Sequence, residues 1–173
     1  MPRIAHALAA LAVLLIAAPP ARAQQPPRPE NPRDVFLAGW SEVGDKLVKM
    51  AEEFPENKFD YKPAEGVRTF GDVLRHVAFW NQWVAKTARG EKPDGKPNEL
   101  PKAEFGTKAK LIAALKSSIA EGAAELKKQG PTPGARETGL WSSFISHSSE
   151  HYGQLVVYYR LNGLVPPASR GTN

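Results

Sequence analysis

The sequence predicts an all-α fold, a four-helix bundle with a long crossover between the second and third helices. Apolar residues recur every three or four positions in four segments of about 20 residues, as on the buried faces of amphipathic helices. Proline and glycine separate these segments, and from residue 24 onwards no convincing alternation of apolar and polar residues indicates a strand. Four antiparallel helices are the simplest architecture that buries four such faces together.

The first 23 residues have the features of a secretory signal peptide. Arg3 provides a positive charge, a largely apolar run covers residues 4–18, and Ala21-Arg22-Ala23 is an A-x-A cleavage site. The apolar run is shorter than the ~20 residues that a membrane span requires. We therefore expect cleavage before Gln24 and export by the secretory route to the periplasm or the medium. No stable membrane insertion is expected after cleavage.

Residues 24–33 are rich in proline and polar side chains, which predicts an extended tether before a bundle domain spanning residues 34–173. The formal net charge of the chain is +5, and cleavage would remove Arg3 and Arg22 without any acidic residue, leaving +3. The remaining Lys and Arg residues are interspersed with Asp and Glu and form no basic run. We therefore expect no nucleic-acid binding.

The first helix is expected from about Asp34 to Phe54. Its predicted buried stripe comprises Val35, Phe36, Trp40, Val43, Leu47 and Met50. In the linker that follows, Phe59 and Tyr61 are expected to pack against the end of the bundle. The second helix is expected between Thr69, which with Asp72 forms a capping box, and Gly90. Its apolar face comprises Phe70, Val73, Leu74, Val77, Trp80, Trp83 and Val84.

Residues 90–106 are rich in proline, glycine and charge and form the crossover, which is long enough to cross the end of a bundle. The third helix is expected from Thr107 to about Gln129. The fourth is expected from about Gly139 to Asn162, with Gly163 at its C-terminal cap. After it, residues 164–167 are expected to leave as an extended tail.

The histidines are the main candidates for chemistry. The chain contains no cysteine, which excludes a disulfide scaffold, a thiolate zinc site and a cysteine nucleophile. His147 and His151 lie four residues apart and share the apolar face of the fourth helix, and His76 lies on the apolar face of the second. Three imidazoles from facing helices would hold a metal ion and leave positions for water or substrate. The alternative is that each histidine is a hydrogen-bonded residue of the core.

The segment from His147 to His151 also matches the H-x-x-E-H motif of inverzincin peptidases, in which the glutamate activates a zinc-bound water. No Asp or Glu follows His151 to complete such a site. The inverzincin interpretation therefore fails at its third ligand. We expect Glu150 to be a solvated carboxylate on the helix surface; a role in supporting a ligand or in acid–base chemistry is the alternative.

Two stretches of the chain resemble the DinB/YfiT-like superfamily. The first is His147-Ser-Ser-Glu-His151-Tyr-Gly-Gln154, continuing to Arg160-Leu-Asn-Gly163-Leu-Val-Pro166-Pro167. The second is Phe59-Asp-Tyr61-Lys-Pro63, followed by Val67-Arg68-Thr69-Phe70-Gly71-Asp72 and then Leu74-Arg-His76. The resemblance covers about residues 34–170. It implies a four-helix bundle, often dimeric, that holds zinc or nickel through one histidine of the second helix and two of the fourth, here His76, His147 and His151.

The resemblance leaves the reaction open. It implies either hydrolases or transferases and isomerases that use low-molecular-weight thiols. Many members have His-His-Arg around the last ligand, whereas this chain has Glu150-His151-Tyr152, which removes a basic neighbour that could bind an anionic thiol. We expect an exported metal-dependent hydrolase or related metalloenzyme acting on an unidentified small molecule. A non-catalytic metal-binding bundle and a thiol-dependent transferase are the alternatives. Trp80, Trp83 and Tyr152 are candidates to line a pocket near the ligands, and core packing is the alternative, which we expect for at least two of them.

Overall fold

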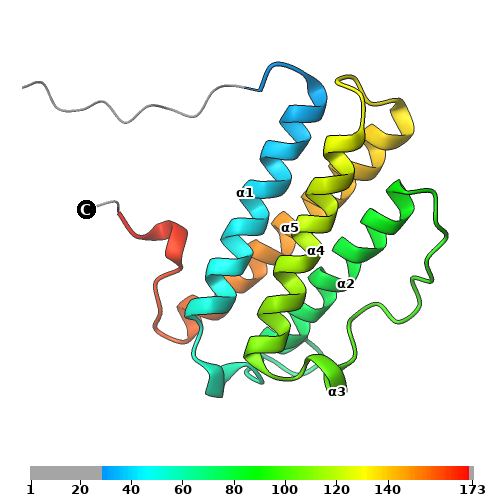
Figure 1. The fold of residues 1–173 in the computed structure, drawn as a ribbon. Helices are drawn as coiled ribbons and strands as arrows, with labels where there is room; N and C mark the ends of the chain where they lie inside the picture. Colours follow the sequence, from blue (N-terminus) through cyan, green and yellow to red (C-terminus); the bar gives the residue numbers. More distant parts are fainter. Residues whose placement is uncertain (1–28, 172–173) are drawn as a thin grey trace, which may run out of the picture.

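The computed structural model describes residues 29–171, and the predicted signal peptide and residues 24–28 of the predicted tether lie outside this range. Within the described range the chain forms α-helices and short 3₁₀ helices and no β-strand (Figure 1). The elements in order are α1 (Pro32–Glu53), η1 (Glu56–Lys58), α2 (Phe70–Ala88), α3 (Lys102–Phe105), α4 (Lys108–Lys128), α5 (Ala135–Leu161) and η2 (Pro167–Ser169). Of the described helices, none is both long and apolar enough to span a bilayer.

The four long helices form the predicted bundle. Helix α4 packs against both α1 and α2, and α5 also packs against both α1 and α2, so that the helices surround one core in the order α1, α4, α2, α5 (Figure 1). Helices α2 and α5 are therefore neighbours although α4 lies between them in the sequence. Their shared seam, which we call the α2–α5 seam, contains all three candidate histidines.

The crossover runs back along α2 and does not simply cross the end of the bundle (Figure 1). The carbonyl of Pro93 accepts a hydrogen bond from Trp83, Asn98 contacts Trp80, and the amide of Leu100 donates to the carbonyl of Arg75. Since the chain returns to the starting end of α2 before α4 begins, α2 and α4 run in the same direction. The expectation of a wholly antiparallel bundle is thus wrong, because a connection of this length permits a parallel pair.

The observed ends of α2 agree closely with the ends predicted from the sequence, and those of the other helices agree less closely. The capping box of Thr69 and Asp72 is confirmed, and Gly163 has the positive φ of 71° expected of a C-terminal cap. Helix α1 starts at Pro32, inside the predicted tether, because the side chain of Asn31 caps it. Helix α5 starts at Ala135, earlier than predicted, and α3 and η2 interrupt segments that we expected to be extended or irregular.

The core confirms most of the predicted stripes. Leu47, Met50 and Phe54 of the first helical segment are fully buried, and Phe59 of the linker is 8% exposed. Val35 is an error of prediction, since it is 54% exposed at the start of α1. Its position fits the helical spacing, but it lies in the first turn of α1, where the side chain of Arg33 bonds the end of α4 and Val35 itself stays exposed.

Candidate metal centre

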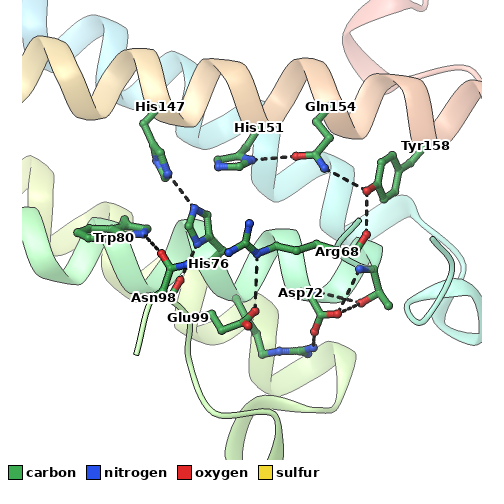
Figure 2. Close-up of polar contacts among 12 residues, drawn as sticks. Arg68, Asp72, His76, Trp80, Asn98, Glu99, His147, His151, Gln154 and Tyr158 are labelled. Atoms are coloured by element: carbon green, nitrogen blue, oxygen red, sulfur yellow. Dashed lines mark hydrogen bonds and ion pairs between the residues drawn. The ribbon is translucent and has the colours of Figure 1, made fainter. Parts of the chain in front are cut away.

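His76, His147 and His151 meet in the α2–α5 seam (Figure 2). One ligand nitrogen from each residue lies within 4.8 Å of the others, and the ring centroids are 4.6–5.0 Å apart. His76 is 6% exposed, whereas His147 and His151 are half-buried. The structure therefore brings together the three histidines that the sequence selected, and in the described residues this is the group with the geometry to hold an ion.

The crossover fixes the orientation of His76. Its Nδ1 lies 2.6 Å from the backbone oxygen of Asn98. Because a carbonyl oxygen can only accept, Nδ1 of the neutral ring carries the proton and the lone pair of Nε2 points into the seam. The side chain of Asn98 also accepts a hydrogen bond from Nε1 of Trp80 at 3.0 Å. One residue of the crossover thus positions both the histidine and the neighbouring indole.

A chain of hydrogen bonds fixes His151 in the same sense (Figure 2). The hydroxyl of Tyr158 donates to the backbone oxygen of Arg68 at 2.8 Å, and it therefore accepts from Nε2 of Gln154 at 3.0 Å. The amide oxygen of Gln154 then faces Nδ1 of His151 at 2.9 Å, so that Nδ1 must donate. The lone pair of His151 Nε2 is left free, as it is in His76.

His147 completes the group from the centre of α5. Its Nε2 lies 3.0 Å from Nε2 of His76, and its Nδ1 is buried with no hydrogen-bond partner among the described residues. Two imidazole lone pairs at this distance repel each other unless a proton or a cation lies between them. A shared ion would remove this repulsion, since two nitrogens bound tetrahedrally to one zinc at about 2.1 Å lie roughly 3.4 Å apart, slightly farther than these two atoms.

The environment keeps His76 and His147 neutral. The pKa of His76 is lowered to about 4, chiefly by burial; Arg68 and His151 act in the same direction, and the hydrogen bond to Asn98 opposes them. Burial likewise lowers the pKa of His147 to about 4, with the charges of His151, His76 and Arg68 acting in the same direction. Neutral imidazole is the form that binds metal ions, so these two donors are ready for coordination at neutral pH.

Several residues around the centre were not selected from the sequence. Asn98 lies in the crossover, where no periodic pattern marks it, and its φ of 60° is the one positive φ of a non-glycine residue in the described chain. Gln154 and Arg68 lie inside the two stretches that carry the family resemblance but had been given no role. Polar residues of irregular segments can be assigned to a site only when the fold brings them there.

The aromatic candidates divide into two groups. The ring centroid of Trp80 is 6.3 Å from those of His76 and His147, and Trp83 packs 5.5 Å from Phe144, which in turn lies 6.0 Å from His147. Tyr152 instead packs against the core, with the ammonium of Lys46 from α1 5.8 Å from its ring centroid. Of the two roles open to Tyr152, it therefore has core packing and not pocket lining, because it faces α1 and not the seam.

Glu150 is exposed, as the sequence indicated. Its carboxylate accepts a hydrogen bond from Ser146 at 3.4 Å on the surface of α5. The H-x-x-E-H match thus provides two of the clustered histidines, while its glutamate lies on another face of the helix.

Comparison of the sequence with known protein families shows which family the chain belongs to. The sequence model of the DinB superfamily matches residues 40–155, from the middle of α1 to the second half of α5. The chain belongs to the DinB superfamily. No curated protein matches it. The match includes all of α2, most of α5 and the three clustered histidines of this DinB-superfamily chain.

The donor set fits a divalent cation. Three imidazoles, with the free Nε2 lone pairs of His76 and His151 directed into one space, match the nitrogen ligands of divalent transition metals. The partners of Nδ1 in these two residues are a carbonyl oxygen and an amide oxygen, which are typical of groups that orient metal-binding histidines. The cluster could therefore hold a metal ion without rearrangement of the helices.

Proposed function

We propose that His76, His147 and His151 bind a divalent cation, zinc or nickel, and that the protein is an exported metal-dependent hydrolase or a related metalloenzyme acting on a small molecule. The observation that carries the proposal is the convergence of three ring nitrogens from α2 and α5 within 4.8 Å. Membership of the DinB superfamily supports it. The signal-like segment of residues 1–23 is the reason for proposing export.

When bound, a divalent cation supplies Lewis acidity, which lowers the pKa of water and polarises carbonyl groups. The three histidines provide only neutral donors, so the positive charge of the ion would not be reduced by a protein carboxylate. Asn98 and Gln154 keep the Nδ1 protons of His76 and His151 in place and so preserve the ligand tautomers. Three protein donors leave room for water or substrate at the ion, as in catalytic sites.

Metal content tests the centre itself. The mature protein should be freed of metal with a chelator, reloaded with zinc or nickel, desalted and subjected to elemental analysis. We expect about one equivalent in the wild type and less than about a tenth in His151→Ala. Glu150→Gln is the matched control, because it changes an exposed residue of the same motif, and it should retain the wild-type content. A folded wild type that retains less than about a tenth of an equivalent contradicts the proposal.

Turnover separates the enzyme from its alternatives. The loaded protein should be assayed with ester, amide, lactone and thiol substrates alongside His151→Ala. Hydrolysis that requires His151 supports the proposed enzyme. Turnover that requires an added low-molecular-weight thiol would indicate the transferase instead. Metal binding without turnover dependent on His151 would indicate a non-catalytic metal-binding bundle.

Export and assembly are tested separately. The intact mass of the secreted or periplasmic protein should correspond to a chain that starts at Gln24, and a retained Met1 would contradict cleavage. Homodimer formation, which we propose from the family resemblance, should double the mass measured by light scattering. A monomer mass would contradict it.

A further inference from the structure

The α2–α5 seam changes in chemical character along its length. Because α2 and α5 run in opposite directions, aromatic residues from both helices gather at one end and polar residues at the other. In order along the seam, the side chains are Trp83 and Phe144, then Trp80, then His147, His76 and His151, and finally Arg68. The candidate metal centre thus lies between an aromatic end and a cationic end.

The aromatic end consists of Trp80, Trp83 and Phe144, which we call the aromatic cluster. The rings of Trp80 and Trp83 lie 5.8 and 5.5 Å from that of Phe144, at interplanar angles of 35° and 29°. All three side chains are only partly buried. Trp83 and Phe144 pack against buried core residues, whereas Trp80 does not. The indole of Trp80 therefore contributes little to the core and presents apolar surface beside the histidines.

The crossover satisfies the polar edges of both indoles. Nε1 of Trp80 donates to the side-chain oxygen of Asn98, and Nε1 of Trp83 donates to the backbone oxygen of Pro93, each at 3.0 Å. A Cβ at Gly95 would lie 3.2 Å from the ring of Trp80, so the crossover backbone packs closely on this indole. The cluster is therefore held rigidly, and its remaining accessible surface is apolar, which suits an aromatic or aliphatic group of a ligand.

The cationic end is the side chain of Arg68, which points along the seam toward the histidines (Figure 2). Its charge acts on His76 and His147, and its side chain is 34% exposed. Arg68 forms an ion pair with Glu99, whose buried Oε2 lies 4.0 Å from Nε of Arg68, a distance too long for a hydrogen bond. Among residues 29–171 the guanidinium donates no hydrogen bond, although it has five N–H groups.

We propose that the α2–α5 seam binds an amphiphilic carboxylate, with its apolar group on the aromatic cluster, its carboxylate on Arg68 and its reacting part beside the histidines. A guanidinium with unused donors matches the planar geometry of a carboxylate and can bind it through two hydrogen bonds. The inference rests on the proposed function in taking the seam as the substrate site.

Three small probes separate the contributions. Calorimetric titration with hydrocinnamate tests ring and carboxylate together, propanoate tests the carboxylate alone, and hydrocinnamyl alcohol tests the ring alone. Each titration should be performed on zinc-loaded and on metal-free protein. Hydrocinnamate should bind the wild type about tenfold more tightly than either partial probe, since each end of the probe adds its own contact.

The variants assign each contribution to a residue. Arg68→Gln should weaken hydrocinnamate about tenfold and leave hydrocinnamyl alcohol unchanged. Trp80→Ala should weaken both ring-containing probes and leave propanoate unchanged. Arg160→Gln is the matched control, because it removes an arginine from the exposed surface of α5 with the same change of charge, and it should bind all probes as the wild type does.

Each outcome decides between the inference and the proposed function. Unchanged hydrocinnamate affinity in folded Arg68→Gln, or no wild-type binding at about 10 mM, overturns the inference. If the inference is overturned but the wild type binds about one equivalent of zinc, the proposed metal centre is supported and the carboxylate site is rejected. If the wild type holds no zinc but hydrocinnamate binding still depends on Arg68 and Trp80, the carboxylate site stands and the proposed metal centre fails.

Discussion

Three histidines are the part of the site that sequence reasoning could find. His147 and His151 share a face of one helix because they are four residues apart, and His76 lies on the apolar face of another. The partners of their Nδ1 atoms could not be found in this way. Asn98 reaches His76 through a backbone oxygen, and a backbone atom leaves no mark in the sequence. Gln154 acts through Tyr158 and the carbonyl of Arg68, a contact across 90 residues that only the fold creates.

Buried neutral histidines make the metal-free protein sensitive to mild acid. His76 and His147 titrate near pH 6.5 in the unfolded chain, whereas burial lowers the pKa of each to about 4 in the folded protein. Between these values the unfolded chain binds more protons, so stability is full above pH 6.5 and is lost as the pH falls toward 4. We expect the free energy of unfolding, measured with urea in the presence of a chelator, to fall by about 4 kcal/mol between pH 7 and pH 5, since each histidine contributes about 2 kcal/mol.

His147→Gln provides the control for this prediction, because it removes one of the two titrating groups. Its free energy of unfolding should fall about half as much over the same pH range. An equal loss in wild type and variant would show that other groups cause the acid sensitivity.

Gln154 should affect metal affinity without contacting the metal. Gln154→Leu keeps the size of the side chain but leaves Nδ1 of His151 without its acceptor. We expect zinc affinity, measured by competition with a chromophoric chelator, to fall about tenfold. Gln154→Glu, which keeps an acceptor for Nδ1, should retain most of the affinity. Equal affinities of wild type and Gln154→Leu would contradict the orienting role.

At the scale of elements, the sequence predicted those helix ends that are fixed by residues close together in the chain. The capping box of Thr69 and Asp72 marks the start of α2 because both partners lie within one turn. Helix α5 starts at Ala135 after Gly134, which has no side chain to cap it, so its beginning had no comparable signal. The path of the crossover along α2 could likewise not be predicted from the sequence. Its bonds to α2 are made by isolated residues such as Pro93 and Asn98, which follow no period.

Asn98 tests how the crossover supports the centre. Its left-handed backbone, with φ of 60°, is tolerated by Asn and Gly but costs about 1 kcal/mol for Ala. Asn98→Ala should therefore destabilise the protein and weaken metal binding, because it strains the carbonyl that holds His76 and removes the acceptor of Trp80. Asn98→Gly should lose only the bond to Trp80 and keep near wild-type metal affinity. Identical metal affinities of the Ala and Gly variants, from elemental and competition measurements, would show that the backbone conformation is unimportant.

At the scale of the molecule, the sequence predicted the long helices and the family but not the direction of every helix. A connection the length of residues 90–106 permits both an antiparallel and a parallel pair, and pattern alone does not choose between them. The close packing that fixes the arrangement depends on shape. Gly122 of α4 lies against Trp40 of α1, whose indole is 2% exposed and donates to the backbone of Ile119 at 2.9 Å.

This α1–α4 contact has no room for a larger residue. A Cβ at Gly122 would lie 2.3 Å from the ring of Trp40, which is held on all sides and cannot turn away. We expect Gly122→Ala to destabilise the protein by about 2 kcal/mol in urea unfolding. Gly139→Ala is the matched control in an exposed part of α5 with open space around it, and it should stabilise by up to about 1 kcal/mol. Similar effects of both substitutions would contradict the packing of these helices.

X-ray absorption spectroscopy of the zinc-loaded protein tests the three-histidine centre most directly, because it counts imidazole ligands around the ion. We predict about three imidazole nitrogens at roughly 2.0 Å in the wild type. His147→Gln, loaded at a zinc concentration high enough to fill the weakened site, should show two. A wild-type spectrum with one imidazole or none would contradict the proposed centre.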